Sequence, residues 1–207
     1  IQRDVRDRVG SLPGVTKVKI DWTELTAEEK ATTMATARRN IAERAPVTAI
    51  PATTQVLMIA SGKGGVGKSS VTVNLATALA ATGFKVGVID ADIWGFSVPR
   101  MLGVDGRLEA GEADGRIAPH RQTVGRGELR IVSMGFLVDD EETALMWRGL
   151  ILQRAVRHFL EDVDWGHDLD YLLIDMPPGT GDVQMGLAKL LPRAEMIVVT
   201  TPSLSAQ

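Results

Sequence analysis

One stretch decides the fold of this chain: Gly62-Lys63-Gly64-Gly65-Val66-Gly67-Lys68-Ser69. It satisfies the pattern G-x-x-x-x-G-K-[ST], in which a glycine-rich loop holds phosphate groups. An apolar run at 56–60 precedes it, and a helical pattern at 68–81, closed by Gly83, follows it. With a strand before it and a helix after it, the pattern predicts a phosphate-binding loop rather than a plain glycine-rich turn.

The residues of this loop have separate roles in holding a nucleotide. Glycines let the backbone turn its N–H groups inward, and the N-terminus of the following helix adds a partial positive charge. We expect Lys68 to reach the β- and γ-phosphates of ATP and Ser69 to ligate Mg²⁺. The predicted nucleotide-binding residues are Gly62, Lys63, Gly64, Gly65, Val66, Gly67, Lys68, Ser69 and Ser70.

Outward from the loop, short apolar runs alternate with helical stretches. The runs lie at 56–60, 85–89, 129–132, 171–174 and 196–200, and the later helical stretches at 150–162 and 182–191. Unbroken apolar strands separated by helices are typical of a parallel sheet covered on both faces. We therefore predict an α/β fold with a doubly wound, mostly parallel sheet of the P-loop NTPase type. The segment 103–127, rich in glycine and charge, is interpreted as a long excursion with one short strand.

The first 45 residues have a different texture. They predict a helix at 1–9, a turn at 11–14, a strand with alternating Val18 and Ile20, and a helix at 27–41. The stretch 46–54 has two prolines and no sustained period, which is typical of a linker. The predicted organisation is the remnant of a small α+β domain at 1–45, a linker at 46–54 and a P-loop ATPase domain at 55–207. We expect both ends of the chain to be cut.

Three aspartates follow apolar runs. Asp90 and Asp92 come directly after the run 85–89, and Asp175 closes the run 171–174. Ligands bind at the carboxyl ends of the strands in sheets of this kind, so these carboxylates are well placed for catalysis. We expect Asp92 to orient the attacking water, and both Asp92 and Asp175 to help hold Mg²⁺ directly or through water. The alternative is that each aspartate is a helix N-cap or a turn former.

Composition limits the remaining classes of function. The 207 residues carry a formal net charge of −3 and contain no cysteine. We therefore expect neither nucleic acid nor membrane as a partner, and a reducing, cytoplasmic location. No apolar run approaches the roughly 20 residues that span a bilayer. The histidines, His120, His158 and His167, lack metal-ligand spacing, and we do not count them as ligands.

Lys63 indicates which class of P-loop protein this is, because an ordinary P-loop does not require a lysine after its first glycine. The string K-G-G-x-G-K-S resembles the deviant Walker A ATPases, and this resemblance implies that Lys63 reaches the nucleotide of a facing subunit in a homodimer. Such a second ammonium would stabilise charge in phosphoryl transfer. The predicted catalytic residues are therefore Lys63, Lys68 and Asp92. The alternative for Lys63 is a solvated loop lysine.

Three longer strings resemble the Mrp/ApbC family, related to the eukaryotic Nbp35 proteins. They are 60–76 around the loop, Asp90-Ala91-Asp92-Ile93-Trp94-Gly95, and Asp175-Met176-Pro177-Pro178-Gly179-Thr180-Gly181-Asp182. The resemblance covers 55–207 almost continuously and implies an ATPase that carries iron–sulfur clusters to apo-proteins. Residues 1–45 resemble the end of the MIP18-like (DUF59) domain often fused to bacterial members. Trp94 and Phe96 depart from the family pattern, and we leave open whether they pack against a partner subunit or within the chain.

The cluster ligands of the family are a Cys-x-x-Cys pair placed beyond the region covered here, so the resemblance assigns no iron–sulfur ligand to this chain. Either the cysteines follow Gln207 or this member lacks them. Two alternatives to the carrier share the same loop. One is a MinD/ParA-like dimerisation switch that binds no cluster. The other is an ATP-dependent metabolic enzyme.

Overall fold

The computed structural model describes residues 2–21, 23–43, 48–92, 95–110, 115–137, 149–179 and 182–202. The chain divides into two compact units, Ile1–Asn40 and Ile41–Gln207. Each unit is described by itself, and the second contains the phosphate-binding loop.

The first unit contains a short helix, α1 (Gln2–Gly10), a turn and most of a longer helix, α2 (Ala27–Glu43). Reciprocal hydrogen bonds define the start of α2. The backbone N–H of Thr26 donates to Glu29 Oε2 at 2.8 Å, and the N–H of Glu29 donates to Thr26 Oγ1 at 3.2 Å. This T-x-x-E capping box satisfies two N–H groups that a helix start otherwise leaves without an acceptor.

The predicted strand around Val18 and Ile20 was wrong. Residues 15–20 form no strand, and neither sheet of the described chain includes them. Alternating apolar residues favour a strand only where a neighbouring strand pairs with it and one face is buried. No such neighbour is present for 15–20 among the described residues.

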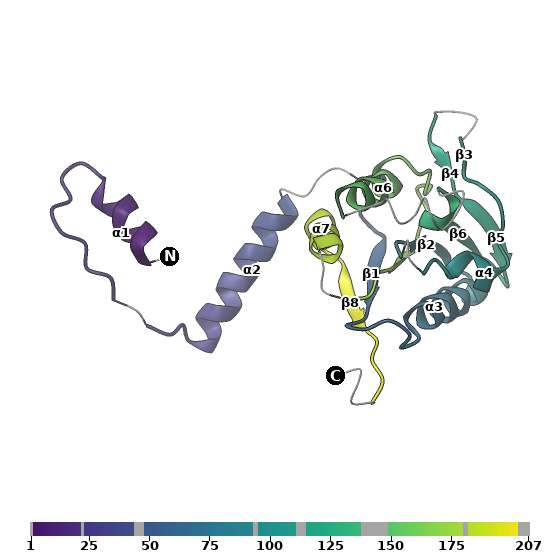
Figure 1. Ribbon diagram of the computed structural model, residues 1–207, viewed down its shortest axis with the longest axis horizontal. Helices are drawn as coiled ribbons and strands as arrows, with labels where there is room; N and C mark the ends of the chain where they lie inside the picture. The colour runs from purple at the N-terminus through teal and green to yellow at the C-terminus, as the bar shows by residue number, and fades with distance from the viewer. Residues whose placement is uncertain are drawn as a thin grey trace. The chain divides into compact units, whose positions relative to one another are not determined.

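The second unit is built on a six-stranded sheet in the order β5-β6-β2-β7-β1-β8 (Figure 1). All neighbours are parallel except β5, which is antiparallel to β6. The predicted mostly parallel α/β sheet is therefore confirmed. The strands are β1 (Gln55–Ala60), β2 (Lys85–Asp90), β5 (His120–Val124), β6 (Gly127–Ser133), β7 (Tyr171–Asp175) and β8 (Glu195–Val198).

Helices cover both faces of this sheet (Figure 1). On one face, α3 (Lys68–Thr82) and α4 (Val98–Leu102) pack on a core that includes Ile59, Val88 and Leu173. On the other face, α6 (Gly149–Glu161) and α7 (Asp182–Leu190) pack on a core that includes the fully buried Phe159 and Trp165. Successive strand residues point to opposite faces, so buried runs fill two cores at once. Among the described residues, no helix has the length and apolar character needed to cross a membrane.

The excursion 103–127 contains more strand than predicted. Two short strands, β3 (Glu109–Ala110) and β4 (Ile117–Ala118), pair with each other, and β5 then adds an edge to the main sheet. The sequence of β5 alternates half-buried and exposed residues, as an antiparallel edge strand does, instead of forming an apolar run. A short 3₁₀ turn, η1 (Met134–Phe136), follows β6.

Candidate functional site

The loop between β1 and α3 presents its backbone to open space. Gly65 and Gly67 have φ values of 76° and 91°, a region that residues with a Cβ rarely adopt. A Cβ built on Gly62, Gly65 or Gly67 would meet no described atom within 4 Å. The loop therefore forms a cradle that its own side chains do not fill.

A cavity of about 470 Å³ lies beside this cradle. Its wall includes most of the loop between Gly64 and Ser70, with the exception of Val66, and, from other segments, Asp92, Ser97 and Pro178. Its volume falls in the range of roughly 300–1,000 Å³ typical of small-molecule sites. The cavity and the helix N-terminus together form a place for a phosphorylated ligand.

Lys68 is the centre of the charged groups in this cavity. Its side chain is only 6% exposed, and its Nζ lies 2.8 Å from Asp175 Oδ1 and 3.7 Å from Asp92 Oδ2. Parallel pairing brings these groups together because the carboxyl ends of β1, β7 and β2 are adjacent in the sheet. Lys68, Asp92 and Asp175 therefore converge at one edge of the sheet.

Two hydroxyl groups of α3 hold the Asp175 carboxylate from the other side. Ser69 Oγ donates to Asp175 Oδ2 at 2.5 Å, and Thr72 Oγ1 lies 2.9 Å from Asp175 Oδ1. Thr72 is fully buried and was not among the predicted site residues. A signal was available, because Thr72 lies four residues after Lys68 and so shares its face of the helix.

Asp90 adds a third carboxylate to the group. It pairs in register with Asp175 of β7 and is completely buried. Burial raises the pKa of Asp90 to about 7, and the neighbouring charge of Asp175 adds to the rise. We call Lys68, Asp90, Asp92 and Asp175 the carboxyl-end cluster. Its three carboxylates outnumber its one ammonium group.

These residues fit a magnesium–nucleotide complex. Mg²⁺ prefers hard oxygen ligands, which Ser69, Asp92 and Asp175 supply, and it commonly takes only one or two from protein, the rest coming from phosphates and water. Within the described residues, no group of three or more His, Cys, Asp or Glu side chains is arranged to hold a metal ion by itself.

The remaining predicted loop residues lie at the rim. Gly62, Lys63, Gly64 and Ser70 are exposed, and Val66 is half-buried. In the described part of the chain, Lys63 makes no ion pair, and its ammonium group is available to a ligand or partner. Trp94, Thr180 and Gly181 lie outside the described residues.

Phe96 and the histidines have local packing contacts. A Cβ on Gly135 would come within 2.5 Å of the Phe96 ring, so Phe96 packs directly over that glycine. His120 lies against Phe136 with ring centroids 4.6 Å apart. His158 Nδ1 lies 2.5 Å from Asp162 Oδ2, one turn away on the surface.

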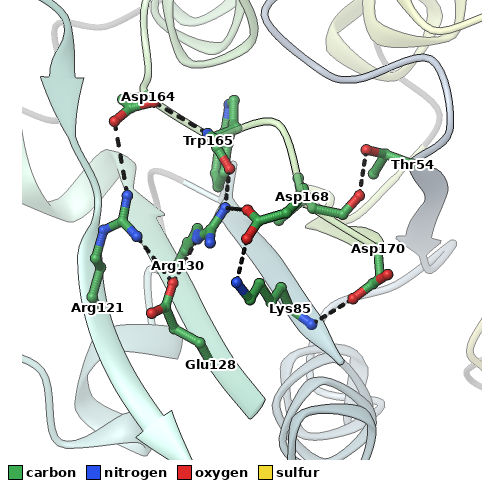
Figure 2. A network of polar contacts seen from close by, with 11 residues as sticks. Thr54, Lys85, Arg121, Glu128, Arg130, Asp164, Trp165, Asp168 and Asp170 are labelled. Carbon is green, nitrogen blue, oxygen red and sulfur yellow. Dashed lines mark hydrogen bonds and ion pairs between the residues drawn. The ribbon is translucent and has the colours of Figure 1, made fainter. Parts of the chain in front are cut away.

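A second charged group lies at the amino ends of the strands (Figure 2). The guanidinium of Arg130 on β6, 3% exposed, contacts Glu128 at 2.6 Å, Asp168 at 2.9 Å and the carbonyl oxygen of Trp165. Asp168 also pairs with Lys85 on β2. We call Lys85, Glu128, Arg130 and Asp168 the amino-end network. This network was not predicted from the sequence, although an arginine within the apolar run of β6 indicates a buried ion pair.

Comparisons with known proteins relate the chain to iron–sulfur carriers. Residues 52–207 match the ParA family described as NUBPL iron-transfer P-loop NTPases. An iron-sulfur cluster carrier protein of Mycobacterium leprae is 42% identical over 207 residues, which are 100% of this chain and 52% of that protein. A cytosolic Fe-S cluster assembly factor of Kluyveromyces lactis is 45% identical over 150 residues, covering 71% of this chain and 53% of that protein. The chain thus spans about half the length of the curated relatives it matches.

A solved structure gives the same assignment of fold. A nucleotide-binding protein from Archaeoglobus fulgidus, determined in complex with ADP, is 36% identical with a TM-score of 0.58. The match covers 73% of this chain and 57% of that one.

Proposed function

The chain belongs to the ParA family of NUBPL iron-transfer P-loop NTPases, and we propose that it is the ATP-hydrolysing part of an iron–sulfur cluster carrier that works as a nucleotide-gated homodimer. One observation carries the proposal: Lys68, Ser69 and Asp92 line a cavity of about 470 Å³ beside an open glycine-rich cradle, and the buried Asp175 contacts both Lys68 and Ser69. The names of the relatives support the carrier role.

In the proposed reaction, the loop backbone and Lys68 bind the phosphates of ATP. Lys68 already faces the cavity and exchanges its contact with Asp175 for the nucleotide oxygens. Ser69 and Asp175 would hold Mg²⁺, which when bound neutralises phosphate charge. Asp92 lines the cavity opposite the loop and would orient the attacking water as a hydrogen-bond acceptor.

The homodimer is proposed from Lys63. This lysine is exposed at the rim of the cradle, where its ammonium group can reach a nucleotide held by a second copy of the chain. Cations brought by a facing subunit stabilise charge that develops during phosphoryl transfer. Hydrolysis would then depend on dimer formation, and the state of the dimer would depend on the nucleotide.

In this proposal, the iron–sulfur cluster is the group that the protein carries. Its usual ligands are cysteine thiolates, and these 207 residues contain no cysteine. Any thiolate ligands would therefore have to come from outside these residues. The proposed recipients are apo iron–sulfur proteins.

Anaerobic reconstitution tests the carrier role. The natural full-length protein is incubated with iron and sulfide, and visible absorbance and cluster transfer to an apo-enzyme are measured. We expect a bound, transferable cluster, and no cluster on the 207-residue chain used as a cysteine-free control. Failure of the full-length protein to bind a cluster while it still binds ATP would reject the carrier role and favour a nucleotide-driven dimerisation switch.

A further inference from the structure

The loop that carries Asp92 is closed by one buried carboxylate. Asp90 Oδ1 accepts the backbone N–H of Asp92 at 3.2 Å, and Asp90 Oδ2 accepts the backbone N–H of Val98 at 3.3 Å. The first contact is a local Asx-type bond, which aspartates make readily. The second joins residues eight positions apart, so the two oxygens together fix the beginning and the end of the segment.

The contact with Val98 also replaces a helix cap. Val98 is the first residue of α4, and Ser97 before it makes no side-chain capping bond. The first N–H groups of a helix need acceptors from outside the helix. Asp90 supplies one from the adjacent strand, and α4 therefore starts at a position set by β2.

Ser133 anchors Asp90 from the neighbouring strand. The two residues face each other in the parallel register of β2 and β6, and Ser133 Oγ donates to Asp90 Oδ2 at 3.2 Å. The same Oγ accepts the backbone N–H of Gly135 at 3.1 Å. Both side chains are fully buried, so no bulk water competes for these bonds.

The middle of the loop docks on the same place. The ring of Phe96 lies so close over Gly135 that a Cβ there would approach it to 2.5 Å. The turn after β6 thus contacts the loop through this ring, and Ser133 joins the same turn to Asp90.

We propose that Asp90 and Ser133 are positioning residues, which clamp the backbone of Asp92 and of Val98 to the ends of β2 and β6 and so hold the Asp92 carboxylate beside Lys68. The catalytic part of this inference rests on the proposed ATPase function, whereas the clamp itself does not. Asp90 acts through the backbone of the loop and is separate from the groups that contact the nucleotide.

Hydrogen exchange of the nucleotide-free chain tests the clamp directly. Asp90→Asn keeps the shape of the side chain but leaves one oxygen to serve two N–H donors. Hydrogen bonds to charged groups are strong enough that exchange at Asp92, at Val98 or at both should speed up about tenfold or more. Ser133→Ala is the second variant, should Asp90→Asn fail to fold, and it should speed exchange at Gly135 most.

Thr54→Val is the matched control. Thr54 Oγ1 donates to the carbonyl of Leu169 at 2.8 Å before β1, far along the strands from the loop. This variant should leave exchange at Asp92 and Val98, and ATP turnover, unchanged. Unaltered exchange at these amides in both Asp90→Asn and Ser133→Ala would overturn the clamp.

Turnover separates positioning from a merely structural role. In Asp90→Asn we expect kcat for ATP hydrolysis to fall at least tenfold while the Kd for a fluorescent ADP changes less than threefold. An equal loss in both would overturn positioning. If exchange speeds up but the wild-type chain neither binds nor hydrolyses ATP, the clamp is supported and the proposed function alone is wrong.

Discussion

The two ends of the sheet hold buried charge in opposite ways. In the carboxyl-end cluster, two carboxylates contact Lys68 and a third, Asp90, pairs in register with Asp175, beside a cavity of about 470 Å³. The amino-end network surrounds Arg130 with two carboxylates, a carbonyl oxygen and the nearby Lys85, so its charges balance (Figure 2). Both are built from strand ends of one sheet, but they lie at opposite ends of the strands and differ in their balance of charge.

The difference teaches which buried charges indicate a ligand. A balanced network whose polar atoms contact one another stabilises the fold and offers no unpaired charge to a ligand. An excess of negative charge beside open space is suited to a cation that arrives from outside, here with the phosphates of a nucleotide. Substitutions in the two groups should therefore change different measurements.

The largest effect is expected for Lys63→Ala. This substitution removes the cation that, in our proposal, the nucleotide site of one subunit receives from the facing subunit. Loss of a group that stabilises transition-state charge typically lowers kcat by about 10²–10³-fold. Nucleotide-dependent dimerisation, followed by analytical ultracentrifugation, should weaken with it. Lys63→Arg, which keeps the charge, is the matched control and should retain part of the turnover. Unchanged hydrolysis and dimerisation in Lys63→Ala would leave Lys63 as a solvated loop lysine.

Lys68→Ala tests whether the carboxyl-end cluster binds the nucleotide. Hydrogen bonds to charged groups contribute about 1.5–3 kcal/mol each, so the affinity for ATP should fall on the order of 100-fold. Isothermal titration calorimetry measures it, with circular dichroism to verify folding. Equal affinity for ATP in the variant and the wild type would show that the nucleotide binds elsewhere.

Arg130→Met should lower the stability of the fold and leave the affinity for ATP unchanged. It leaves the Trp165 carbonyl and two carboxylates without their guanidinium, and the free energy of unfolding should fall by about 2–3 kcal/mol. Urea unfolding measures this loss. The affinity of the folded fraction for ATP should stay within twofold, because the partners of Arg130, Glu128 and Asp168, lie near the amino ends of β6 and β7, away from the nucleotide site. A large loss of affinity would mean that the two ends of the sheet are coupled.

Features that depend on residues close in sequence could be predicted, and contacts between residues far apart in sequence could not. The loop, its flanking strand and helix, and the aspartates at the ends of β2 and β7 could be predicted because each depends on residues close in sequence. The contact between Asp90 and Ser133 could not, since 43 positions separate them and the pairing of β2 with β6 brings them together. Arg130 and Asp168 meet for the same reason.

The errors concern partners as well. A strand was expected around Val18 and Ile20 because the apolar residues alternate, yet no described strand pairs with them. The segment 103–127 was predicted to hold one short strand because it is rich in glycine and charge, yet β3 pairs with β4 and β5 pairs with β6. The sequence pattern indicates which side chains of a segment could be buried. Whether they are buried depends on the neighbouring elements of the tertiary structure.

The smallest effect concerns the exposed side of the amino-end network. Lys85 and Arg130 lower the pKa of Asp168 below its usual value of 3.8. A lowered folded pKa means that this stabilisation is present above pH 3.8 and is lost as the pH falls through the folded value. Because the Asp168 side chain is 51% exposed, solvent screening limits its contribution to about 1 kcal/mol.

Asp168→Asn should therefore lower the free energy of unfolding by about 1 kcal/mol at pH 7 and by less at pH 3. Urea unfolding at the two pH values measures the difference, with Asp105→Asn, an exposed aspartate that forms no ion pair within the described residues, as the control. The same loss at both pH values would mean that Asp168 acts through hydrogen bonding or packing and not through its charge. In either case ATP affinity should not change, because a closed network at the amino ends has no part in holding the ligand.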